Sequence, residues 1–166
     1  MLGAACTAVR MPVAFLNTEL SVFYSANYNT FMEVSMKILV ADDDFVNRRF
    51  LEKIFGEYGE VVAVDNGMSA VDEAVRAMES ASFFDLICLD IMMTRLDGYK
   101  TLEAIREAEN KYAVASGNRA KVMMISALDE VALDNAQVCN DYDAYICKPI
   151  VVDKFEKLLS KLGFDK

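Results

Sequence analysis

The chain has 166 residues, of which 54% are hydrophobic and 26% are charged, so it can bury a sizeable core and is not a disordered acidic tail. Its net charge of -9 argues against nonspecific binding to a phosphate backbone, which requires clustered lysine and arginine, so we expect no direct nucleic-acid partner. The absence of histidine excludes His-dependent triads, histidine general bases and most zinc sites. The four cysteines have no CxxC spacing and no apolar run could span a membrane, so we expect a soluble, cytoplasmic protein.

Residues 1–35 form an N-terminal extension with few charges and no sustained hydrophobic period. Its apolar run MPVAFL is too short for the core of a signal peptide, and Arg10 is its only basic residue. Three interpretations remain open: a disordered leader, an extra packing segment, or a start codon assigned too far upstream. We favour the third, because Met36 opens the segment MKILVADDD, which reads as the beginning of the fold.

From Met36 onward, short apolar and β-branched runs alternate with longer segments of helical period. The predicted strands cover residues 37–41, 61–65, 85–90, 121–127 and 144–148. The predicted helices cover residues 46–55, 67–78, 98–108, 130–139 and 152–162. This alternation is typical of βαβ units, so we predict an α/β domain over residues 36–166 with a doubly wound, five-stranded parallel sheet. The fifth helix leaves no room for an effector domain before Lys166, which predicts a stand-alone domain.

Polar side chains follow four of the five predicted strands, where each strand ends. In an open parallel sheet, ligands bind beyond these carboxyl ends, near the point where the strand order reverses. Helix capping could explain any one of the polar residues, but not all of them on one edge of the sheet. The residues, in chain order, are Asp42, Asp43 and Asp44, then Asp90, then Ser126, and finally Lys148.

The clustered carboxylates suit a magnesium ion, which prefers oxygen ligands in near-octahedral geometry. Asp43 and Asp90, assisted by Asp42, could supply the carboxylates, and the backbone carbonyl of Met92 could reach the same ion. The lysine and the serine at the neighbouring strand ends would bind phosphoryl oxygens by charge and by hydrogen bond. The residues therefore predict a Mg²⁺-dependent site for phosphoryl transfer to a carboxylate.

The chain resembles the response-regulator receiver domains of two-component signalling, the CheY-like proteins, from Met36 to about Leu162. Four segments carry the resemblance, in the order and at the separations usual for the family: ILVADDDFVNRRFLEKIF, LICLDIMMTRLDG, VMMISA and AYICKPI. The resemblance implies a flavodoxin-like (βα)5 fold with strand order 2-1-3-4-5.

The resemblance also implies a role for each matching residue. It makes Asp90 the phosphoacceptor, and it makes Asp42 and Asp43 the acidic pair that binds the metal. Ser126 would be the switch hydroxyl and Tyr145 the switch aromatic. Lys148 matches the family's lysine, which is followed by a proline that is often in a cis peptide bond. Asp97 and Gly98 match the turn after the phosphorylation loop. One position departs from the family: Thr94 replaces the proline usual four residues after the phosphoacceptor, which removes a fixed φ but no catalytic group.

The resemblance implies a phosphoprotein that acts as a signalling switch in a phosphorelay. Asp90 is expected to accept a phosphoryl group from a phosphohistidine on a sensor histidine kinase or phosphotransfer protein. Ser126 and Tyr145 are then expected to bias the surface of the fourth helix, fifth strand and fifth helix towards a downstream protein partner. We expect no enzyme activity beyond the domain's own phosphorylation and dephosphorylation. The kinase, the stimulus, the output target and homodimerisation on phosphorylation stay open.

Two side chains suggest a long-lived phosphoryl group. Met92 and Leu128 occupy the family positions that flank the hydrolytic water, and neither can hydrogen-bond to it, so we expect slow autodephosphorylation.

Three alternatives have weaker support. A haloacid-dehalogenase-like Mg²⁺ phosphatase matches only the DxD pattern of Asp42 and Asp44, and it expects Gly-Thr or similar residues next. A flavodoxin-like cofactor binder is disfavoured because three acidic residues would repel a phosphate. A degenerate receiver is disfavoured because Asp43, Asp90, Ser126 and Lys148 are all present.

Overall fold

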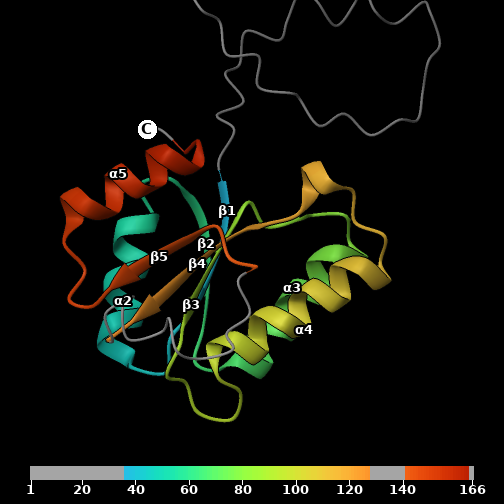
Figure 1. Ribbon diagram of the computed structural model, residues 1–166, viewed down its shortest axis with the longest axis horizontal. Helices are drawn as coiled ribbons and strands as arrows, with labels where there is room; N and C mark the ends of the chain where they lie inside the picture. Colours follow the sequence, from blue (N-terminus) through green and yellow to red (C-terminus); the bar gives the residue numbers. More distant parts are fainter. Residues whose placement is uncertain (1–35, 128–140, 165–166) are drawn as a thin grey trace, which may run out of the picture. The chain divides into compact units, whose positions relative to one another are not determined.

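The computed structural model describes residues 36–127 and 141–164 of the chain. Five parallel strands form one sheet in the order β2-β1-β3-β4-β5, with helices on both faces (Figure 1). The strands are β1 (Met36–Ala41), β2 (Gly59–Val64), β3 (Leu86–Asp90), β4 (Lys121–Ser126) and β5 (Ala144–Cys147). The predicted α/β, flavodoxin-like fold and its strand order are therefore confirmed.

Helices cover the two faces of the sheet in pairs (Figure 1). The helices are α2 (Phe45–Phe55), α3 (Gly67–Glu79), α4 (Gly98–Lys111) and α5 (Val152–Leu162), together with a short 3-10 helix at Ser116–Asn118. Helices α2 and α5 pack on one face of the sheet, and α3 and α4 pack on the other. The extension 1–35 and the predicted helix 130–139 lie outside the described residues. None of the helices in the described ranges is both long and apolar enough to cross a membrane.

The core consists of two apolar clusters, one on each face of the sheet. Successive strand residues point to opposite faces, so Leu39 faces the α3–α4 side while Ile38 faces the α2–α5 side. Both are fully buried, as expected for a parallel sheet that helices cover on both faces. Phe55 of α2 packs edge-to-face on Phe155 of α5 with ring centroids 4.9 Å apart, which joins the two helices.

The predicted element bounds differ from the observed ones mainly at β2 and α4. β2 begins at Gly59, two residues before the β-branched pattern, because its pairing with β1 extends to Met36. A Cβ atom at position 59 would lie 1.9 Å from the carbonyl oxygen of Met36, so this pairing requires glycine. α4 continues to Lys111, three residues beyond its predicted end.

Candidate functional site

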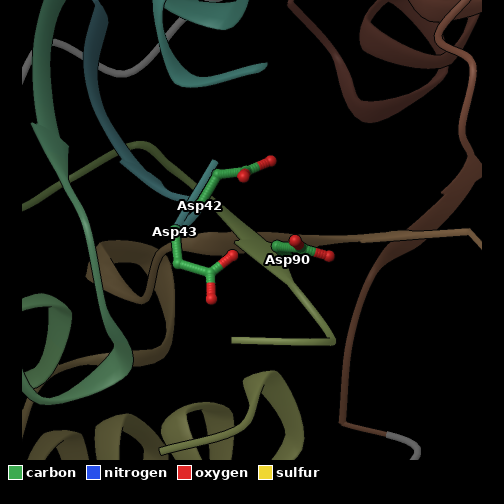
Figure 2. A group of neighbouring side chains, drawn as sticks. All are labelled: Asp42, Asp43 and Asp90. Carbon is green, nitrogen blue, oxygen red and sulfur yellow. The ribbon is translucent and has the colours of Figure 1, made fainter. Parts of the chain in front are cut away.

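The ends of β1 and β3 bring three carboxylates together (Figure 2). The strand order reverses here, because β1 pairs with β2 on one side and with β3 on the other. Asp42 and Asp43 directly follow β1, and Asp90 is the last residue of β3. One carboxylate oxygen from each of the three lies within 4.8 Å of the others. This is the edge at which open α/β sheets bind ligands.

Lys148, just beyond β5, reaches two of these carboxylates. Its Nζ atom donates to Asp42 Oδ2 at 2.9 Å and to Asp90 Oδ2 at 2.8 Å. Burial alone would lower the pKa of Lys148, but its hydrogen bonds to Asp90 and Asp42 outweigh burial and raise that pKa. Lys148 therefore remains a cation between two nearly inaccessible carboxylates. The Lys148–Pro149 peptide bond is cis, as the resemblance implies.

The site retains an excess of negative charge even with Lys148 present. Asp42 is fully buried and its pKa is raised, because burial disfavours its charged form by more than Lys148 stabilises it. Three carboxyl groups meet here, whereas Lys148 is the one cation that contacts their side chains within the described residues, so acidic groups outnumber basic ones in the cluster. A divalent cation bound to the three oxygens would neutralise this excess, so the donor set fits Mg²⁺.

Ser126, the last residue of β4, lies between the strands that carry Asp90 and Lys148. The Lys148 N–H donates to the Ser126 carbonyl at 2.6 Å, and the Ile91 N–H donates to the carbonyl of the preceding Ile125 at 2.9 Å. Ser126 is fully buried, so its hydroxyl is enclosed near the site rather than exposed to solvent. Its role as a switch hydroxyl stays a prediction.

Tyr145 lies in β5 on the face of the sheet that α3 and α4 cover. Its half-buried ring lies 6.3 Å from that of Tyr142, centroid to centroid, and both pack against the same apolar cluster. The structure thus places the predicted switch aromatic at the margin of the core. Of the predicted partner surface, β5 and α5 are described, whereas residues 130–139, like Leu128, lie outside the described residues.

Two other aspartates near the site have structural roles. Asp44 caps α2 by accepting the Asn47 N–H at 2.9 Å, and Asp97 caps α4 by accepting the Lys100 N–H at 2.9 Å. Burial would raise the pKa of Asp97, but its hydrogen bonds with Lys100 outweigh this and lower it. Asp44 is exposed, so the DxD pattern does not bring its side chain into the carboxylate cluster.

The loop after β3 is fixed close to the cluster. The Met92 N–H donates to Asp90 Oδ1 at 3.3 Å, and the Gly98 N–H donates to the Ile91 carbonyl at 3.0 Å. A Cβ atom on Gly98 would lie 2.4 Å from the Asp90 carbonyl oxygen, so only glycine permits this close approach. The Met92 side chain is 65% exposed, and the role of its carbonyl as a metal ligand stays a prediction.

Two contacts near the site have no signal in the sequence. Arg48 Nη1 of α2 donates to the Asp42 carbonyl at 2.6 Å, which brings a second cation beside the end of β1. The Thr94 N–H donates to Asp43 Oδ2 at 3.0 Å, although the two residues are 51 positions apart in the chain. Both depend on how a loop or helix packs, which motif spacing does not report.

The family model for the response regulator receiver domain matches residues 38–160. The chain belongs to this family. A curated relative, the hybrid signal transduction histidine kinase L of Dictyostelium discoideum, is 30% identical over 130 residues, or 76% of this chain. The chain spans only 7% of that relative's length. The predicted resemblance to receiver domains of two-component signalling is therefore confirmed.

Solved receiver domains also resemble this chain. The receiver domain of the histidine kinase CKI1 from Arabidopsis thaliana, complexed with Mg²⁺ and BeF3⁻, matches with 25% identity and a TM-score of 0.63, covering 78% of this chain and 91% of that one. The receiver domain of the sensor histidine kinase PA1611 from Pseudomonas aeruginosa has Mg²⁺ in its active-site cleft. It matches with 25% identity and a TM-score of 0.61, covering 78% of this chain and 98% of that one. The acidic cluster described above is compatible with such an ion.

Proposed function

We propose that this receiver domain is a phosphorylation-activated switch and that Asp90 accepts the phosphoryl group. The observation that carries the proposal is the double contact of Lys148 with Asp90 and Asp42, next to a third carboxylate at the point where the strand order reverses. A buried carboxylate with a lysine on one side and a cation site on the other suits attack on an anionic phosphoryl donor.

Mg²⁺ would be held by Asp43 and Asp90, assisted by Asp42 and by the carbonyl of Met92. The ion, when bound, supplies positive charge that reduces the repulsion between the donor phosphoryl group and the carboxylates. The excess negative charge of the cluster and the proximity of its three oxygens support this assignment.

The proposed donor is a phosphohistidine on a sensor histidine kinase or phosphotransfer protein. A carboxylate oxygen of Asp90 attacks phosphorus, an O–P bond forms, and the N–P bond breaks with its electron pair remaining on the imidazole nitrogen. The Lys148 ammonium, now on Asp90 Oδ2, would pair with one phosphoryl oxygen, and the Ser126 hydroxyl would donate to another. The presence of receiver domains in related histidine kinases supports such a donor.

The output would follow from the charge that phosphorylation adds beside Ser126. Movement of the Ser126 hydroxyl towards the phosphoryl group would open space for Tyr145, and the surface of residues 130–139, β5 and α5 would bind a downstream protein. Homodimerisation through this surface is a further form that the output could take. A cytoplasmic location belongs to the proposal, because the cysteine spacing fits a reducing compartment.

The proposed chemistry is confined to the domain's own phosphorylation and dephosphorylation. A haloacid-dehalogenase-like activity would need the second aspartate of the DxD pattern in the site, but Asp44 caps α2 instead. The family match supports a signalling switch over a phosphatase.

The test is phosphorylation of the purified protein by acetyl phosphate, followed by intact mass. We expect wild type to gain one phosphoryl group only when Mg²⁺ is present. Asp90→Asn should gain none, while Asp85→Asn, a change at the opposite end of β3, should behave as wild type. Folded wild-type protein that gains no mass, or an Asp90→Asn variant that does, would overturn the proposal.

A further inference from the structure

Asp43 differs from the other two carboxylates in what holds it. Lys148 contacts Asp42 and Asp90, whereas Asp43 Oδ2 accepts a hydrogen bond from the main-chain N–H of Thr94, with 3.0 Å between nitrogen and oxygen. Asp43 is also the most exposed of the three. An exposed carboxylate without such a bond would rotate among several orientations, so this contact determines where its oxygens lie.

The loop that carries Thr94 is fixed on both sides of the donor. The Leu96 N–H donates to the Thr94 carbonyl at 2.9 Å, and Arg95 between them has the left-handed φ of 68°. Further along, Gly98 packs against the end of β3 and its N–H donates to Ile91. The Thr94 N–H is therefore presented by a defined loop conformation rather than by a mobile segment.

The donor exists only because residue 94 is not proline, which has no N–H. A threonine at this position gives the loop a donor to a carboxylate of the cation site, which the proline usual in the family could not provide. The hydroxyl of Thr94 takes no part in this bond, so any residue except proline would preserve it.

We infer that Thr94 is a positioning residue for the cation site: its main-chain N–H holds Asp43 Oδ2 and orients the carboxylate before Mg²⁺ binds. The inference rests on the proposed function, because it takes the carboxylate cluster as the Mg²⁺ site. A ligand whose orientation is already restricted loses less freedom when the ion binds, so the contact strengthens binding. Partners that orient a metal ligand typically change metal affinity by about 10- to 100-fold.

The test compares two substitutions of Thr94 by the dissociation constant for Mg²⁺, measured by titration calorimetry on the unphosphorylated protein. Thr94→Ala keeps the N–H and should bind Mg²⁺ as wild type does. Thr94→Pro removes it and should bind on the order of 10-fold more weakly. Equal affinity of the two variants, or tighter binding by Thr94→Pro, would overturn the inference.

A second measurement needs no substitution. The Thr94 amide proton of wild type should show the downfield shift and slow exchange of a hydrogen-bonded amide, and should keep them at saturating Mg²⁺. Loss of both on adding Mg²⁺ would mean that the ion competes with the bond, which contradicts the inference. If wild type binds Mg²⁺ and is phosphorylated on Asp90 but Thr94→Pro binds normally, only this inference fails. If wild type binds no Mg²⁺, the proposed function fails with it.

Discussion

Tyr99, at the start of α4, carries a buried hydroxyl with no hydrogen-bond partner, the one such side-chain atom within the described residues. Its ring packs against the same apolar cluster as Tyr142 and Tyr145. Burial, together with the charges that Tyr145 and Tyr142 would acquire, raises the pKa of Tyr99 from 10.0 to about 12. Its protonated form is therefore favoured in the folded state.

Replacement of Tyr99 by phenylalanine removes this hydroxyl and tests its environment. We expect Tyr99→Phe to change the free energy of unfolding at neutral pH by no more than about 1 kcal/mol, because no hydrogen bond is lost. Between about pH 10 and 12 the unfolded state loses the tyrosine proton while the folded state keeps it, so wild type should lose stability relative to the variant as pH rises. Urea unfolding across this range measures the difference. A large loss of stability at neutral pH would reveal a partner for the hydroxyl.

Met92 presents an exposed thioether two residues after Asp90. Because this side chain cannot donate a hydrogen bond to water, we expect the acyl phosphate to hydrolyse slowly. Met92→Asn should shorten the half-life of the acyl phosphate severalfold. Met68→Asn is the control, because Met68 is also exposed but lies on α3, and it should leave the half-life unchanged. The measurement is the decay of phosphorylated mass after removal of acetyl phosphate. A half-life of seconds in wild type, or one that Met92→Asn leaves unchanged, would contradict the expectation.

At this scale the sequence predicts which groups meet but not all of the bonds between them. The proximity of Lys148 and Asp90 was predictable, because the carboxyl ends of parallel strands share one edge. The bonds from Thr94 to Asp43 and from Arg48 to the end of β1 depend on loop and helix placement, which no spacing rule supplies.

A buried ion pair joins α4 to β4 at the amino ends of the strands, opposite the acidic cluster at their carboxyl ends. Glu109, 2% exposed, accepts from Arg106 Nη1 at 2.9 Å and from the Ala120 N–H at 3.2 Å. Arg106 also donates to the carbonyls of Ala120 and Asp141, each at 3.1 Å. These bonds fix the last turns of α4 to the start of β4 and to the segment before β5.

Loss of Arg106 should destabilise the fold through the carboxylate that it leaves behind. We expect Arg106→Met to lower the free energy of unfolding by about 3 kcal/mol, because the buried Glu109 loses its ion pair at 2.9 Å and keeps only the longer pair with Arg119 at 3.8 Å and the hydrogen bond from the Ala120 N–H. Arg49→Met is the matched control: it breaks an exposed pair with Glu52 and should cost less than about 1 kcal/mol. Urea unfolding compares the two. Similar small losses would mean that the Arg106 pair adds nothing to the connection between α4 and β4.

Element positions follow closely from hydrophobic period, whereas their ends depend on neighbours. The observed α5, Val152–Leu162, coincides with its prediction because the helical period and Gly163 at its end agree. β2 starts earlier than predicted because Gly59 pairs with Met36, a contact between strands that the local pattern does not contain. The predicted helix 130–139 lies outside the described residues and stays a prediction.

At the scale of the whole molecule, the strand order creates the site. An alternation of strands and helices predicts a parallel sheet but allows several orders, so the order 2-1-3-4-5 came from the family resemblance. That order places β1 between β2 and β3, which brings Asp42 and Asp43 beside Asp90 (Figures 1 and 2). The same order places β5, which Lys148 follows, two strands from β3. The Lys148 side chain can therefore reach across the end of β4 to Asp90.

The central claim is that Asp90 alone receives the phosphoryl group and that Mg²⁺ is required. Its most direct test is to phosphorylate the protein with acetyl phosphate, reduce the acyl phosphate with borohydride, and locate the reduced residue by peptide mass spectrometry. We predict reduction at position 90 only, and none when a chelator removes Mg²⁺. Reduction at Asp42 or Asp43 instead, or at position 90 irrespective of Mg²⁺, would contradict the account.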